Sequence, residues 1–128
     1  MPKYGTLEWV QQKQKIWNEN AEIRRLLRGY YSTLVTKMAG SPELKPIFTK
    51  IEDGRQTEVR YAEPNDKPEY TYEATMEVWK AIWLGELDPM KAVVSGKLKL
   101  AGPLEKMMNY TKGFMKGLEL EKKVPTEW

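Results

Sequence analysis

The spacing of apolar residues changes period along this chain, and this change restricts the fold more than any other feature of the sequence. Residues 6–40 and most of residues 76–120 place apolar side chains three and four positions apart, which is typical of amphipathic helices. Between them, residues 46–75 alternate apolar and polar side chains, which is typical of strands with one solvated face. Helices on both sides of a strand-rich middle predict an α+β fold.

The N-terminal part of this pattern predicts two helices. Thr6 is a suitable N-cap for the first, because its side chain can accept a hydrogen bond from the first turn, and Leu7 and Trp17 lie on the apolar side. The second keeps helical spacing without interruption from Ile23 to Met38 and ends at Gly40-Ser41-Pro42. We therefore expect the first 40 residues to be helical.

Four short segments are predicted as strands. Residues 46–52 and 57–61 alternate apolar and polar side chains, and they flank Asp53-Gly54, a sequence that favours a hairpin turn. Residues 70–75 alternate in the same way after a loop that contains two prolines. Residues 97–101 place leucines on one face of a short strand and lysines on the other.

Helical spacing returns after the third of these strands. Residues 76–87 predict one helix, and Asp88-Pro89 predicts the start of a short second one, because aspartate caps helices and proline fits their first position. Gly102-Pro103 opens a final helix that continues to Leu118. The tail, residues 122–128, is expected to be frayed.

The chain contains no cysteine and no histidine. These absences exclude disulfides, thiolate nucleophiles, serine-histidine and cysteine-histidine catalysis, and the commonest transition-metal ligands. No set of carboxylates is placed to converge on a metal or to work as an acid–base pair, so we expect no catalytic residue, no metal site and no cofactor. With 128 residues the chain has the length of a single domain.

Basic and acidic side chains alternate along the chain, whose formal net charge is +3. Nucleic-acid binding needs a basic cluster, and the only arginine group, Arg24-Arg25 with Arg28, falls on the solvent side of a predicted helix. No stretch approaches the roughly 20 apolar residues of a membrane-spanning helix, and the N-terminus lacks the apolar segment of a secretory signal. We therefore expect a soluble cytoplasmic protein with no nucleic-acid partner.

Two groups of large side chains are candidates for a binding site. Met107, Met108 and Met115 form a stripe near the C-terminus, and methionine suits a pocket that accepts varied shapes. Trp79 and Trp83 lie one turn apart on a predicted helix. Each group either fills a core or lines a cavity, and core packing is the more frequent role of such residues.

Two linked motifs follow these tryptophans. Gly85 to Ala92 reads G-E-L-D-P-M-K-A, and Gly96 to Gly102 reads G-K-L-K-L-A-G. At this spacing they resemble the sterol carrier protein 2 (sterol-transfer) domain family, in which a helix precedes the first motif and an amphipathic helix follows the second. Pro46 to Gly54 resembles the first strand and turn of that family. The likeness covers about residues 45–120 and leaves the N-terminal helices of residues 1–40 outside it.

The resemblance implies a twisted, mostly antiparallel sheet of four or five strands, covered by helices, with an apolar tunnel between the layers. It implies a fatty acid, a fatty acyl-CoA, a sterol or a phospholipid as the ligand in that tunnel. Residues on the inward faces of three elements are predicted to line it: Trp79, Ile82, Trp83, Leu98, Leu100, Leu104, Met107, Met108 and Met115. The additional N-terminal helix either covers the tunnel or offers the surface for a homodimer.

These observations favour one domain, residues 1–128, that binds or transfers a lipid-like ligand without catalysing a reaction, with transient membrane contact during transfer. The alternative is an interaction or substrate-presenting module that serves a separately encoded enzyme. The two hypotheses differ in what native mass spectrometry would find. The first predicts a copurifying lipid, and the second predicts an empty protein or an oligomer.

Overall fold

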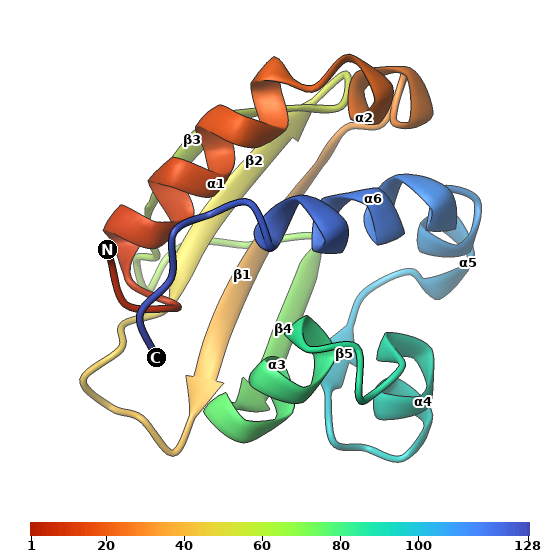
Figure 1. The fold of residues 1–128 in the computed structure, drawn as a ribbon. Helices are drawn as coiled ribbons and strands as arrows, with labels where there is room; N and C mark the ends of the chain where they lie inside the picture. The colour runs from red at the N-terminus through yellow and green to blue at the C-terminus, as the bar shows by residue number, and fades with distance from the viewer.

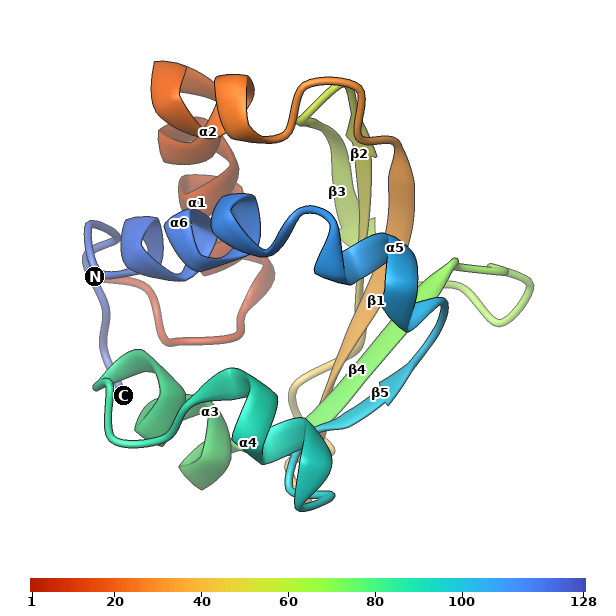
Figure 2. The ribbon, with the colours of Figure 1, turned by 90° about the vertical axis from the view of Figure 1, so that its right-hand side faces the viewer.

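The computed structural model describes residues 1–128, in which a five-stranded sheet is covered by helices on one side (Figures 1 and 2). The strand order is β3-β2-β1-β4-β5, so the first strand in the chain is the middle strand of the sheet. β1 pairs with β4 in parallel, and every other pairing is antiparallel. The strands are β1 (Ser32–Ala39), β2 (Ile47–Glu52), β3 (Arg55–Tyr61), β4 (Tyr70–Thr75) and β5 (Lys99–Ala101). The predicted α+β class and the mostly antiparallel sheet are confirmed.

Three of the helices begin where the sequence predicts, because a side chain caps each of them. The hydroxyls of Thr6 and Thr75 accept hydrogen bonds from Trp9 and Val78, and the carboxylate of Asp88 accepts one from Lys91. The helices are α1 (Leu7–Glu19), α2 (Ala21–Leu26), α3 (Met76–Trp83), α4 (Pro89–Val94), α5 (Leu104–Met108) and α6 (Thr111–Glu121). None of them is long and apolar enough to cross a bilayer.

The predicted helix from Ile23 to Met38 is wrong. Only α2 is helical there, the chain turns at Gly29 with a φ of 80°, and the remainder forms β1. The helical spacing is coincidental, because adjacent Leu34 and Val35 of β1 lie on opposite faces of the sheet and Thr36 lies between Leu34 and Met38 on the pocket face, which hides the alternation of a strand. The fifth strand of the sheet therefore comes from the segment expected to be helical.

The C-terminal part of the chain also differs from its prediction. The expected final helix is interrupted at Asn109-Tyr110, which separates α5 from α6. The tail is not frayed, because Val124 is buried and the ring of Trp128 stacks on Tyr4 with 4.5 Å between centroids. The two ends of the chain consequently lie side by side (Figure 1).

The buried apolar side chains form three separate clusters instead of one continuous core. One packs α1, α2 and α6 on β2 around Leu27, a second packs α3 and α4 on the sheet around Ala74, and the third surrounds Trp9 near the termini. All three clusters contribute residues to one internal pocket. The candidate site is this pocket, which lies between the three clusters.

Candidate ligand-binding pocket

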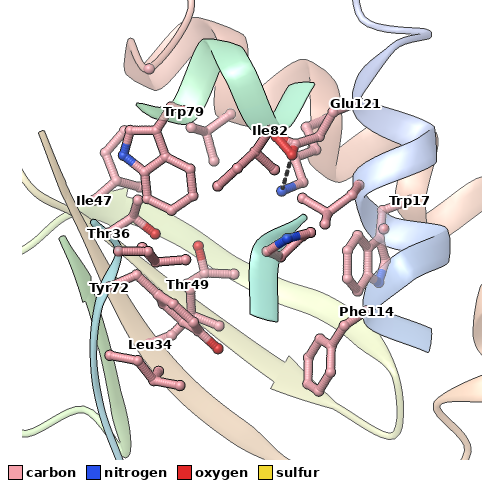
Figure 3. A pocket seen from close by; sticks show the side chains of 18 of the residues that line it. Trp17, Leu34, Thr36, Ile47, Thr49, Tyr72, Trp79, Ile82, Phe114 and Glu121 are labelled. Carbon is pink, nitrogen blue, oxygen red and sulfur yellow. Dashed lines mark ion pairs between the residues drawn. The ribbon is translucent and has the colours of Figure 1, made fainter. Parts of the chain in front are cut away.

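A pocket of about 230 Å³ lies between the sheet and the helices. It is lined by 29 residues, of which 19 are hydrophobic. They come from the N-terminal segment, from every strand and from every helix except α2. Figure 3 shows side chains from the sheet projecting toward Trp17, Trp79 and Ile82 on the helices. This mostly apolar lining suits an apolar molecule.

The sheet provides the floor of the pocket through the alternation of its strands. Leu34 and Thr36 of β1 pair with Thr49 and Ile47 of β2, and Thr36 also pairs with Tyr72 of β4. Residues that pair across neighbouring strands point to the same face, so these five side chains form one surface under the helices. Burial raises the pKa of the Tyr72 hydroxyl above its usual value, so Tyr72 is a neutral hydrogen-bonding group there.

The helices close over this floor because two glycines of α6 allow side chains from α1 and from the end of α2 to pack directly on its backbone. At Gly117, an added Cβ would lie 2.5 Å from the ring of Trp17, and at Gly113 it would overlap a methyl carbon of Leu27. Only glycine allows such contacts, so these two positions set how closely α6 lies to α1 and α2. Trp17 and Phe114 thereby become walls of the pocket.

Polar groups gather at one side of the pocket, which we call the inner end and define by Lys13, Gln56 and Glu121. The Glu121 carboxylate is buried and lies 3.6 Å from the Lys13 ammonium. Burial raises the pKa of Glu121 above its usual value, and the charge of Lys13 opposes that rise. The side-chain oxygen of Gln56 is buried without a hydrogen-bond partner.

The pocket reaches the surface at another side, which we call the mouth and define by Met90, Thr111 and Met115. Met90 of α4 is 38% exposed and Met115 of α6 is 47% exposed, although both line the pocket. α1, which carries Lys13, and α4 lie on opposite sides of the molecule (Figure 1). The mouth and the inner end are thus different places along one cavity.

Residues 11–115 match the SCP-2 sterol transfer family. The chain belongs to this family. A crystal structure of sterol carrier protein 2 superposes with a TM-score of 0.83 at 19% identity, covering 95% of this chain and 99% of that one. A conserved hypothetical protein from Thermus thermophilus gives a TM-score of 0.79 at 18% identity, covering 94% of this chain and 88% of that one.

The fold of the SCP-2 sterol transfer family also occurs within a larger enzyme. A sec-alkylsulfatase from Pseudomonas sp. superposes with a TM-score of 0.53 at 22% identity, covering 76% of this chain but only 14% of that one. At these identities the likeness concerns the fold alone. No curated protein sequence matches the chain.

Within this SCP-2 fold, the structure brings six of the nine predicted site residues to the pocket. They are Trp79, Ile82, Leu98, Leu100, Met107 and Met115. Trp83, Leu104 and Met108 lie outside its lining. Trp83 packs against the ring of Trp128, with 5.4 Å between centroids. Leu104 and Met108 are 43% and 58% exposed, because the break at Asn109 gives α5 a different orientation from the continuous helix that was predicted.

The sequence reasoning missed the contribution of α1 to the SCP-2 pocket. Trp9, Lys13 and Trp17 are spaced four residues apart, and all three line it. The Lys13 ammonium lies 6.0 Å from the ring centre of Trp9 and 5.7 Å from that of Trp17. A lysine between two tryptophans on the apolar side of a helix was a signal for a charge at the pocket, and the Lys13 side chain is 22% exposed. Of the two roles considered for the additional helix, the structure has it covering the pocket.

Proposed function

We propose that this chain binds one lipid-like molecule in the pocket and transfers it without chemical change. The observation that carries the proposal is a mostly apolar cavity, inside the fold of a lipid-carrier family, that reaches solvent at the mouth. Fatty acids, fatty acyl-CoA, sterols and phospholipids all have an apolar body that such a cavity would receive.

The size of the pocket supports a ligand that can leave again. At about 10–15 Å³ of such internal space for a group the size of a water molecule, 230 Å³ has room for roughly 15–20 methylene groups. Burial of fifteen methylenes is favourable by about 12 kcal/mol before the costs of association and ordering are subtracted. The net affinity is then moderate, as transfer between two locations requires.

The titratable groups of the pocket support a noncatalytic role. Burial raises the pKa values of Tyr4 and Tyr72, so neither phenol supplies a base near neutral pH. The carboxylate of Glu121 is paired with Lys13 instead of facing a nucleophile. Binding and release are the activities that these groups fit best.

The surface around the mouth supports transient contact with an anionic membrane. Residues 89–118 contain six lysines and one glutamate, whereas the other 98 residues carry 15 basic and 17 acidic side chains. Lys91, Lys97 and Lys112 are exposed and take part in none of the ion pairs of the structure. Exposed Val94 and Met108 lie in the same segment.

An anionic bilayer is the partner that fits both features of this surface. Its headgroups would attract the unpaired lysines, and its apolar interior would receive the methionine and valine side chains. Two other lysines of the segment lie beside acidic residues and are less available to headgroups. Lys116 is paired with Glu22 and Glu119, and Lys99 pairs across the strands with Glu73.

The binding proposal is tested by filling the pocket from its floor. Thr49 points into the pocket from β2, and Thr71 of β4 points to the opposite face of the sheet. We expect Thr49→Phe to lower uptake of the fluorescent hydrocarbon diphenylhexatriene at least about tenfold, since the ring would occupy the cavity, and we expect Thr71→Phe to have little effect.

Melting curves measured beside this titration separate a cavity from a packed core. If the site were only core, Thr49→Phe would overpack it and cost about 1–3 kcal/mol of stability with no binding to lose. Native mass spectrometry of the purified chain adds the identity of any copurifying lipid and the oligomeric state. An empty monomer or dimer that takes up no hydrocarbon would favour a module serving a separately encoded enzyme.

A further inference from the structure

The inner end of the mostly apolar pocket holds a charged pair, of which Glu121 is buried and Lys13 is partly exposed. Glu121 is the last residue of α6, and Lys13 lies on α1 between the two tryptophan rings. Their 3.6 Å separation is longer than a close charge-assisted hydrogen bond, and the Tyr4 hydroxyl is the other polar neighbour of the carboxylate, which has about four acceptor sites and so keeps capacity for another partner. In Figure 3 the Glu121 carboxylate points toward the space beside Ile82.

Gln56 adds a second, independent polar group to the inner end. Three hydrogen bonds fix its backbone under α1. The side chains of Gln14 and Asn18 each donate one to its backbone carbonyl oxygen, and its backbone N–H donates the third to the side-chain oxygen of Asn18. Gln56 is 5% exposed and lines the pocket, yet the oxygen of its side-chain amide accepts no hydrogen bond. A buried acceptor without a partner is costly, so a donor from a ligand would satisfy it.

The wall of the pocket supplies an unused donor as well. The indole nitrogen of Trp79 is buried without an acceptor, and Trp79 lines the pocket. Lys13 as a donor and Gln56 and Glu121 as acceptors therefore line the inner end, whereas the indole nitrogen of Trp79 lies on the side of its ring away from Glu121 (Figure 3). A group that both donates and accepts a hydrogen bond matches this set, and a hydroxyl is the smallest such group.

We propose that the inner end is a subsite for the hydroxyl group of a lipid alcohol, which enters with its hydroxyl first and leaves its apolar body toward the mouth. The proposal rests on the lipid-binding function proposed above and narrows the ligand class. From Met115 at the mouth to Glu121 at the inner end, α6 rises about 9 Å at 1.5 Å per residue. An apolar body lies along that length.

The charge balance of the inner end selects against a carboxylate or a phosphate. Lys13 and Glu121 already neutralise each other, so an anionic headgroup would bring a second negative charge beside a buried one. A hydroxyl brings no charge and disturbs the pair least. The raised pKa of Glu121 agrees with a site that tolerates little additional negative charge.

The test compares ligands that differ only in their polar end. Dodecan-1-ol and dodecanoate are titrated at about pH 8 against the chain loaded with diphenylhexatriene, which has no polar group. We expect the alcohol to displace the probe at a concentration about tenfold lower than the acid. Cholesterol measured beside its methyl ether repeats the comparison for a ring alcohol. Whichever of dodecan-1-ol and cholesterol displaces the probe at the lower concentration shows whether the site prefers a chain alcohol or a sterol.

Glu121→Gln and its control assign this preference to the inner end. The variant keeps the shape of the side chain and removes its charge, so Lys13 becomes free to pair with a carboxylate. We expect dodecanoate to gain about tenfold in affinity in this variant and the preference for the alcohol to disappear. Glu119→Gln, on the same helix with its side chain 64% exposed, should leave the preference unchanged.

Gln56→Met provides a second test that leaves the ion pair intact. It removes the unpaired acceptor with little change in length, and we expect dodecanol to bind about fivefold more weakly with no change for dodecanoate. Equal displacement by alcohol and acid in the unmodified chain would overturn the subsite, and so would a Glu121→Gln variant that behaves like Glu119→Gln. A chain that takes up no diphenylhexatriene would instead contradict the proposed function itself.

Discussion

The inner end and the mouth belong to one pocket but are built in opposite ways. At the inner end, Glu121 is buried, its charge is balanced by Lys13, and the ring of Trp17 packs directly on the backbone of α6. At the mouth, Met90 and Met115 are exposed and the nearby Lys91 and Lys112 have no ionic partner. The inner end therefore contributes to both stability and ligand choice, whereas the mouth is free to meet a changing partner. Substitutions of similar chemistry should have very different effects at the two places.

The largest difference is expected from one lysine at each place. Lys13→Met leaves the Glu121 carboxylate buried without its counter-charge, which should cost about 3 kcal/mol of unfolding free energy at about pH 8. Lys112→Met at the mouth should change the unfolding free energy by less than about 0.5 kcal/mol, because Lys112 is exposed and unpaired. Urea denaturation of both variants and the unmodified chain measures the contrast.

The pH dependence of Lys13→Met identifies Glu121 as the cause. A carboxyl group whose pKa is raised by folding is protonated more readily in the folded chain, so its contribution to stability is greatest at low pH and declines as pH rises through the folded pKa. Without Lys13 that pKa rises further, and the loss caused by Lys13→Met should shrink as the pH falls. A loss that is the same at all pH values would contradict this account.

An intermediate effect is expected from the close approach of the helices at the inner end. Gly117→Ala places a methyl group 2.5 Å from the atoms of the Trp17 ring, so α6 must move away from α1. Overpacking of this kind costs about 1–3 kcal/mol, which outweighs the gain of up to about 1 kcal/mol from the better helix propensity of alanine. Thermal melting measures the balance, and an increase in melting temperature would show that the contact relaxes without cost.

The smallest effect is expected at the mouth and concerns membrane contact alone. A lysine near an anionic surface contributes about 1 kcal/mol, so Lys112→Gln should weaken binding to phosphatidylglycerol vesicles about fivefold. Lys15→Gln changes an exposed lysine on α1 and serves as the matched control. Cosedimentation with vesicles measures both variants. Equal losses would show that overall charge, not the mouth, directs the chain to membranes.

The sequence was sufficient wherever local signals act alone. The caps at Thr6 and Asp88 and the turn at Asp53-Gly54 determine their elements through neighbouring residues, and the structure has each of them in place. β1 was missed because its apolar residues do not alternate, since adjacent Leu34 and Val35 lie on opposite faces of the sheet, and a chance spacing from Ile23 onward resembled a helix.

The candidate site was accessible only in part for a related reason. The apolar lining from Trp79 to Met115 follows from the inward faces of individual elements, which a pattern can reveal. The pairing of Lys13 with Glu121 depends on α1 lying beside the end of α6, and nothing near either residue indicates that contact. Met108 was misplaced because the interruption at Asn109 gives α5 a different orientation from α6, so that Met107 lines the pocket and Met108 is exposed.

The position of β1 in the middle of the sheet has a consequence for the order in which the molecule assembles. β1, β2 and β3 follow each other in the chain and pair as neighbours, so they need only short loops to close. β4 must pass both β3 and β2 to reach the free side of β1, where Tyr70 pairs with Leu34. Such a distant pairing closes slowly, so the three-stranded meander is expected to form first and β4 to dock afterward. The floor of the pocket, to which Tyr72 belongs, is complete only after that docking, so a ligand recognises and stabilises the last-formed part of the sheet.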